Sequence, residues 1–267
     1  MTCVRATYVL MILWMATAAH SAAQTIWTAP YVPSQVAVEW MQPLYDDATG
    51  RSGQAVFVSA GYLINENIEV VAEVPVSVNA AVAGGAATST VGNPYLGLRL
   101  AGVDWPFLVE VGGRLGLASF GGAAGLDPLA SVGRTKAFVP EEYSGHLALN
   151  GRLQLGEKLT ARLRAGLVYA EHPTAPSGAT TEQAVRSHYS VQFWREDEWV
   201  TIGLAGSART VLTTQPGPNT LFYATGTVIF NTPYVRPGLF LSSPINSTVR
   251  NTAPYVLGLS LSTSLFR

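Results

Sequence analysis

Residues 143–171, YSGHLALNGRLQLGEKLTARLRAGLVYAE, form two alternating segments joined by a tight turn. The apolar face of the pair is made by Tyr143, Leu147, Leu149, Leu153, Leu155, Leu159, Ala161, Leu163, Ala165, Leu167 and Tyr169. The opposite face carries Arg152, Arg162 and Arg164. A repeat of two indicates β-structure, because successive side chains of a strand point to opposite sides. Each segment has about a dozen residues, roughly twice the usual length in a soluble sheet, which is typical of a transmembrane β-barrel.

The same pattern recurs along the chain and predicts about twelve strands. We expect them at 32–44, 54–63, 68–79, 94–101, 107–119, 143–155, 159–171, 185–195, 199–213, 221–230, 235–241 and 255–267. Long connections alternate with short turns through the whole sequence, as they do in outer-membrane barrels. The predicted fold is therefore all-β: a closed antiparallel transmembrane β-barrel of about 12 strands, with short periplasmic turns and longer external loops. Closure is required because an open sheet edge in lipid would leave backbone groups unpaired.

The composition supports a membrane protein. Charged residues make up 12% of the chain, about half the usual share for a soluble domain, and hydrophobic residues make up 48%. No interior apolar run is long enough for a membrane helix. The net charge of −1 gives no sign of a nucleic-acid partner. The expected partners are membrane lipids, the outer-membrane assembly machinery and a small solute.

The first residues predict a secretory signal peptide at 1–23, followed by the barrel at 24–267. Arg5 supplies a positive start, residues 8–19 form an apolar core, and small residues follow it. We therefore expect export to the bacterial outer membrane. The one cysteine, Cys3, lies inside this segment, so the mature protein is expected to contain no thiol.

Charged side chains on the inward register predict a polar lumen. The lumen-lining candidates are Glu69, Glu73, Arg99, Glu110, Arg114, Arg152, Arg162, Arg164 and Arg186, and Glu39 and Glu196 share their register. One interpretation is a channel or transporter that selects anionic or polar solutes by an arginine ladder. The alternative is that arginine–glutamate pairs fill a narrow barrel and satisfy each other. For single residues we favour mutual pairing; for the Arg152, Arg162 and Arg164 group both interpretations stay open, since these three arginines share one hairpin face that has no acid.

An enzyme is the less favoured class. A membrane-embedded lipid hydrolase needs a histidine and a serine on the lipid-facing register. His146 and His188 point inward on strands separated by a third, roughly 10 Å apart, which is too far for a shared proton. The histidines show no metal spacing, and the glycine pairs lack a following Lys-Ser/Thr. We expect no catalysis, metal or other cofactor, and a non-conducting scaffold barrel remains the second hypothesis.

The whole chain resembles bacterial outer-membrane β-barrel proteins. Within that class, Gly61-Tyr62, residues 65–67 and 73–75, and the run Gly92-Asn93-Pro94-Tyr95-Leu96-Gly97-Leu98 are similar to the strand–turn–strand sequences of channels grouped with phenol-degradation outer-membrane proteins. Those channels are distantly similar to fatty-acid transporter barrels. The resemblance implies uptake of small compounds, hydrophobic ones among them. Barrels of this class commonly end in an aromatic residue that faces the lipid. Here Phe266 is penultimate, and alternation places it on the opposite side from the apolar face.

Overall fold

The structure, a computed structural model, describes residues 34–45, 53–79, 88–101, 107–118, 134, 136–172, 182–213, 220–251 and 253–265. Its elements are β1 (Gln35–Leu44), β2 (Gly53–Asn65), β3 (Ile68–Asn79), β4 (Thr88–Val91), β5 (Tyr95–Ala101), β6 (Phe107–Arg114), β7 (Tyr143–Gln154), β8 (Leu159–His172), β9 (Glu182–Glu196), β10 (Val200–Val211), β11 (Thr220–Phe230), β12 (Arg236–Pro244), α3 (Ser247–Arg250) and β13 (Tyr255–Ser264). The signal peptide predicted at 1–23 lies outside the described residues. No helix in the described part of the chain is long and apolar enough to cross a membrane.

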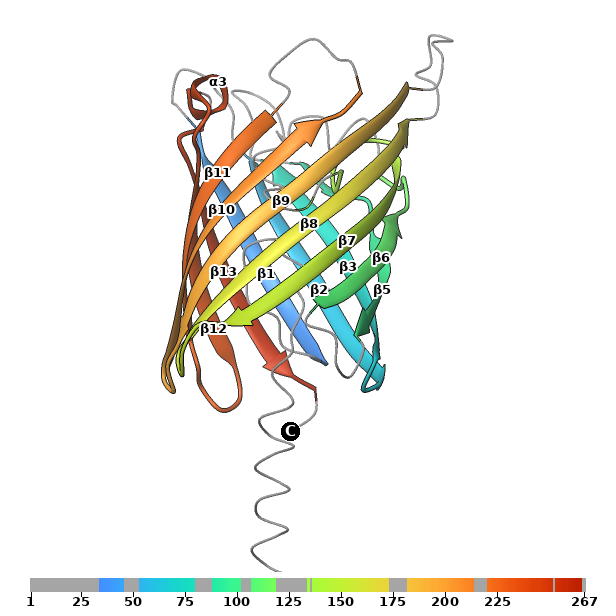
Figure 1. Ribbon diagram of the computed structural model, residues 1–267. Helices are drawn as coiled ribbons and strands as arrows, with labels where there is room; N and C mark the ends of the chain where they lie inside the picture. Colours follow the sequence, from blue (N-terminus) through green and yellow to red (C-terminus); the bar gives the residue numbers. More distant parts are fainter. Residues whose placement is uncertain are drawn as a thin grey trace, which may run out of the picture.

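The strands close into one antiparallel barrel (Figure 1). β1 pairs with both β2 and β13, and the remaining strands pair in chain order round the wall. β4 and β5 pair with successive parts of β3, so together they fill one position. The described residues therefore form twelve positions round the wall, and the predicted twelve-stranded barrel is confirmed.

The strand that contains β4 and β5 is interrupted where a single strand at 94–101 was expected. Pro94 has no backbone N–H to donate to a ladder, which breaks the pairing at this point. The backbone N–H of Gly92 still donates to the carbonyl of Pro75 at 2.8 Å, so the wall stays continuous. The side chain of Asn93 is fully buried inside the barrel, where it organises the site described below.

β6 ends at Arg114, five residues before its expected end at residue 119. The chain turns away because the N–H of Leu115 donates to the carbonyl of Pro94 at 3.0 Å, and the N–H of Ala118 donates to Asn93 Oδ1 at 2.8 Å. These hydrogen bonds take the place of the strand-to-strand backbone hydrogen bonds that a longer strand would make.

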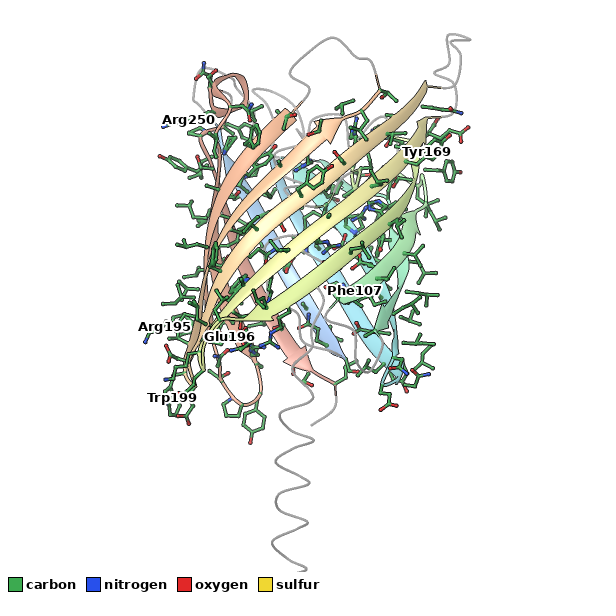
Figure 2. The ribbon with its side chains drawn as sticks, in the orientation of Figure 1. Phe107, Tyr169, Arg195, Glu196, Trp199 and Arg250 are labelled. Carbon is green, nitrogen blue, oxygen red and sulfur yellow. The ribbon has the colours of Figure 1, made fainter. Side chains whose placement is uncertain are left out.

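The outer wall is apolar along every strand position, as the alternation predicts. Leu163 is 58% exposed, whereas its neighbour Arg164 is 6% exposed. Other outward apolar side chains are Val58, Val74, Leu98, Val111, Leu147, Leu149, Leu167, Val191, Ile202, Leu204, Phe222, Leu239, Leu241, Leu257, Leu259 and Leu261. Tyr169 and Trp199 project outward near opposite ends of the barrel (Figure 2). A contiguous apolar exterior with aromatic residues toward its ends is the lipid-facing surface of a transmembrane barrel.

Close packing inside the wall depends on glycines beside large rings. Trp194 on β9 is fully buried and lies over Gly203, its register partner on β10, where a Cβ atom would overlap the ring. Its indole N–H donates to Gln192 at 2.9 Å. Phe240 covers Gly258 in the same way. These glycines let interior rings lie flat against the neighbouring strand.

The described short turns gather at one end of the barrel, and α3 lies at the other (Figure 1). At the short-turn end, Asp197 accepts hydrogen bonds from Lys158 at 2.6 Å and Arg195 at 2.8 Å. The bond from Lys158 lowers the pKa of the Asp197 carboxyl below its ordinary value. The bonds join two successive short turns, β7–β8 and β9–β10.

Surface labelling tests the orientation of this barrel. We expect the short turns to be periplasmic, so Arg250→Cys on α3 should react with an impermeant maleimide on whole cells and Glu157→Cys on the β7–β8 turn should not. Both side chains are exposed, and the single native cysteine lies in the expected signal peptide. Glu157→Cys should label after the outer membrane is permeabilised, which controls for reactivity. Labelling of Glu157→Cys alone on intact cells would reverse the orientation.

Candidate functional site

The interior of the barrel is lined by charged side chains. Seven of the nine predicted candidates are buried: Glu69, Glu73, Arg99, Glu110, Arg114, Arg162 and Arg164. Arg152 and Arg186 are half-buried. Glu39 is also buried. Burial of this many ionised groups requires partners of opposite charge, so their pairing decides what the interior can bind.

One set of pairs centres on Glu110 of β6. Arg99 bridges Glu69 and Glu110, with nitrogen–oxygen distances of 3.0 Å to each. The hydroxyl of Tyr95 donates to Glu110 at 3.0 Å, and Arg164 reaches the same carboxylate at 3.2 Å. This cluster joins β3, β5, β6 and β8, and the hydrogen bonds hold each carboxylate in place.

A second set centres on Glu73 of β3. Arg114 donates to one oxygen of Glu73 at 2.7 Å and to the carbonyl of Asn93 at 2.9 Å. Arg134 donates to the other oxygen at 2.6 Å and also pairs with Glu39. Its guanidinium carbon lies 4.0 Å from the ring centroid of Phe57. Arg134 is only 1% exposed, so a residue from a loop is enclosed within the barrel.

Arg134 and residues 136–142 form what we call the inner segment, which packs against the inside of the wall. The side-chain nitrogen of Asn93 donates to the carbonyls of Lys136 and Val139 at 2.9 and 2.6 Å. Lys136 also pairs with Glu142. Phe138 packs on Phe57 with ring centroids 5.6 Å apart. An apolar cluster encloses these rings: Met41, Ala55, Phe57, Ala118, Ala137, Phe138, Tyr223, Phe240, Ala253 and Val256.

The inner segment corrects the expectation that residues 120–142 form a wholly external loop. Residues 119–133 and 135 lie outside the described part, but 136–142 fold inward. The physical reason is that Glu39 and Glu73 face the same part of the interior, and Arg134 neutralises both. Sequence reasoning missed Arg134 because it lies in a loop, where alternation assigns no face.

The three arginines that we considered as a filter, Arg152, Arg162 and Arg164, are divided between two carboxylates. Arg152 and Arg162 both face Glu196 of β9, at 3.5 and 2.8 Å. Arg164 pairs instead with Glu110 of β6. Arg162 also lies 5.7 Å from the ring of Trp194. The hairpin face itself has no acid, but neighbouring strands supply one, because the interior brings β6 and β9 toward β8.

The wall from β10 to β13 differs from the rest, since it contributes no carboxylate. After Glu198 the sequence contains no aspartate or glutamate. Besides apolar side chains such as Ile229 and Phe240, the buried side chains here include four hydroxylated ones, Thr201, Thr225, Thr227 and Ser242, which we call the hydroxyl wall. Thr225 donates to Ser242 at 2.9 Å. The interior therefore has an ion-paired side, mainly β1 to β8, and an acid-free side.

The two histidines on strand interiors offer no lipid-facing pair. Ser144 Oγ and His146 Nε2 lie 3.1 Å apart, and His188 is 2% exposed inside the wall. Among the described residues no group of three His, Cys, Asp or Glu side chains is placed to hold a metal ion. The Ser144–His146 contact lies inside the barrel and not on the lipid face that a membrane hydrolase would use.

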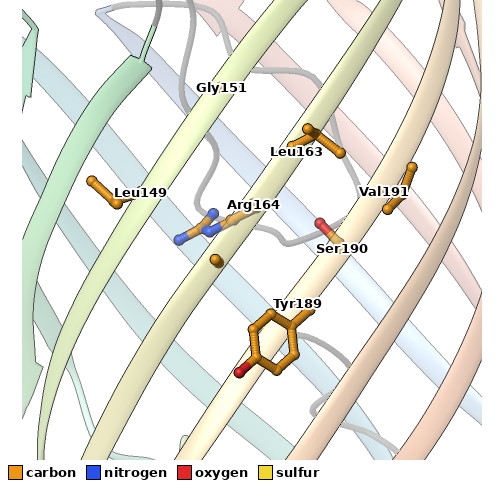
Figure 3. A pocket seen from close by; sticks show the side chains of 8 residues that line it. Leu149, Gly151, Leu163, Arg164, Tyr189, Ser190 and Val191 are labelled. Carbon is orange, nitrogen blue, oxygen red and sulfur yellow. The ribbon is translucent and has the colours of Figure 1, made fainter.

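A shallow apolar hollow of about 310 Å³ lies on the outer wall over β7, β8 and β9 (Figure 3). Leu149, Leu163, Tyr189 and Val191 stand round Gly151, which has no side chain to fill the space. Arg164 and Ser190 also line the hollow, although their side chains are buried. The hollow belongs to the lipid-facing surface and not to the interior site.

Comparison with known proteins places the fold. No family model and no curated protein matches the sequence. Among solved structures, the NanC porin aligns with a TM-score of 0.55 and 8% identity over 87% of this chain and 100% of that chain. An outer membrane channel from Pseudomonas putida F1 aligns with a TM-score of 0.55 and 14% identity, over 91% and 99%. LpxR from Salmonella typhimurium aligns with a TM-score of 0.53 and 9% identity, over 87% and 100%.

Similarity at these identities establishes the fold alone. The finer resemblance to channels grouped with phenol-degradation proteins stays a prediction. The apolar exterior and closed wall agree with the structural matches. The chain therefore has the fold of bacterial outer-membrane β-barrel proteins.

Proposed function

We propose that the barrel is an outer-membrane channel for small solutes, with a preference for anions. The observation that carries this is the charge imbalance of its interior. Arg152 and Arg162 share Glu196, and β10 to β13 supply no carboxylate. Cations that exceed their carboxylate partners raise the local concentration of anions and lower the barrier to their passage. The structural matches with porins and channels support the channel class.

Reversal potentials test this proposal. Purified protein in a planar bilayer with a salt gradient should show an anion-selective reversal potential. Replacing Arg152, Arg162 and Arg164 by glutamine should shift it toward cation selectivity, because Glu196 loses both arginines and Glu110 loses one. Arg195→Gln is the control, since Arg195 is exposed near the end of β9 and pairs with Asp197 on the adjacent turn. Heat-modifiable gel mobility checks that each variant folds.

The results separate three interpretations. An unchanged reversal potential in the folded triple variant would make these arginines structural braces of the wall. No conductance from any folded variant would refute the channel. That result would favour a non-conducting scaffold barrel, for which the inner segment packed against Phe57 is the supporting observation. Lipid turnover by the purified protein would support the hydrolase class.

A further inference from the structure

A basic cluster lies on β9 and β10, next to the hydroxyl wall. His188 is the register partner of Arg209, and Arg186 is two residues from His188 on the same inward face. Arg209, His146, Arg164 and Arg186 all act on His188 electrostatically. Arg164 is already paired with Glu110, and the remaining concentration of basic side chains is a favourable environment for an anion.

Two polar groups beside this cluster are buried with unmet hydrogen-bonding capacity. One terminal nitrogen of Arg209 and the hydroxyl of Tyr223 have no hydrogen-bond partner in the described part of the chain. The guanidinium carbon of Arg209 lies 5.2 Å from the ring centroid of Tyr223, so the two side chains are neighbours. Buried unpaired donors are costly, and a bound ion or solute is one way that proteins satisfy them.

The wall next to the cluster is lined by small residues. Gly166 of β8 is the register partner of His188, and Ala148 of β7 is the partner of Gly166. On the other side, Tyr223 pairs in register with Ser207, and Thr225 follows on the same inward face. Long basic side chains thus project over a surface of small side chains, while hydroxyl groups flank them.

We propose that Arg186, His188, Arg209 and Tyr223 bind the carboxylate of a small hydroxylated organic acid, whose hydroxyl groups contact Thr225 and Ser242, the nearest members of the hydroxyl wall. The planar guanidinium group of an arginine can donate two parallel hydrogen bonds to a carboxylate, and the hydroxyl of Tyr223 adds a third donor. Threonine and serine hydroxyls both donate and accept, so they suit a solute that carries hydroxyl groups. This inference rests on the proposed function, since the solute has to enter the barrel.

Equilibrium binding tests the site without requiring conduction. Isothermal titration of the purified full-length barrel in detergent should give the tightest binding for gluconate. Hexanoate, which has the charge without the hydroxyls, should bind more weakly, and sorbitol, which has the hydroxyls without the charge, should not bind measurably. Arg209→Gln should weaken gluconate binding by at least about tenfold, the effect of losing a charge-assisted hydrogen bond. Arg250→Gln on α3 is the matched control and should bind like the parent protein.

The outcomes decide the proposal in each case. Unchanged gluconate affinity in folded Arg209→Gln, equal affinity for hexanoate, or no binding of any probe to the parent protein would refute the site. Should Arg209→Gln fail to fold, Arg209→Lys keeps the charge but loses the fork, and Tyr223→Phe removes only the hydroxyl. Both should weaken binding, and unchanged affinity in both would refute the site. Binding with no conductance in bilayers would refute the channel and leave the site standing.

Discussion

Replacing Glu73 by glutamine is expected to lower the free energy of unfolding by about 3–5 kcal/mol, the usual cost of removing one partner from a buried ion pair. Glu73 is 2% exposed, and both of its oxygens bind arginines, Arg114 at 2.7 Å and Arg134 at 2.6 Å. Glutamine keeps the volume but removes the charge. Arg114 would then have no carboxylate among the pairs observed here, and Arg134 would keep only Glu39.

Urea unfolding in detergent, followed by heat-modifiable gel mobility, measures this loss. The double variant Glu73→Gln with Arg114→Gln should recover part of the lost stability, because it removes the stranded charge together with its partner. Asp197→Asn is the control acid: its pairs with Lys158 and Arg195 lie on exposed turns, so its loss should stay within about 1 kcal/mol. Equal effects of Glu73→Gln and Asp197→Asn would show that the interior pairs contribute no more than surface pairs.

Replacing Leu163 by arginine should destabilise the barrel by about 2–4 kcal/mol if residue 163 lies near the membrane midplane. Leu163 stands on the lipid face, 58% exposed, beside the hollow at Gly151. A charge at this position must leave water for hydrocarbon, or else distort the bilayer around it. Urea unfolding of the protein from lipid vesicles measures this loss of stability. Vesicles are used because water approaches residue 163 more closely in a detergent micelle than in a bilayer.

Arg164→Leu is the matched control one residue away. Arg164 faces the interior, and Glu110 would keep its bonds from Arg99 and Tyr95 after the change. The loss should therefore be much smaller than for Leu163→Arg. Equal damage from both variants would mean that the two faces are wrongly assigned, because a shift of one residue exchanges them.

The alternation along each strand was enough to predict the fold and the direction of most side chains. Leu163 outward, Arg164 inward, and Val74 and Val78 of β3 outward all follow from a period of two, which is a local property of the backbone. The alternation of long and short connections gave the antiparallel order of the strands. The interruption at Pro94 was not expected, although proline removes a ladder donor, because the small-residue stretch before it shows no clear alternation.

The partners inside the barrel were decided by the tertiary structure. Alternation places Glu73 inward but cannot show that it meets Arg134, 61 residues away in a loop. It places Arg164 inward but cannot show that closure of the wall brings Glu110 to it from β6. Arg209 and Tyr223 become neighbours only because β10 and β11 pair in one particular register. A strand's sequence determines which face a side chain takes, since that depends on adjacent residues. Which charges meet across the interior depends on barrel closure, register and side-chain length together, and these are properties of the folded chain.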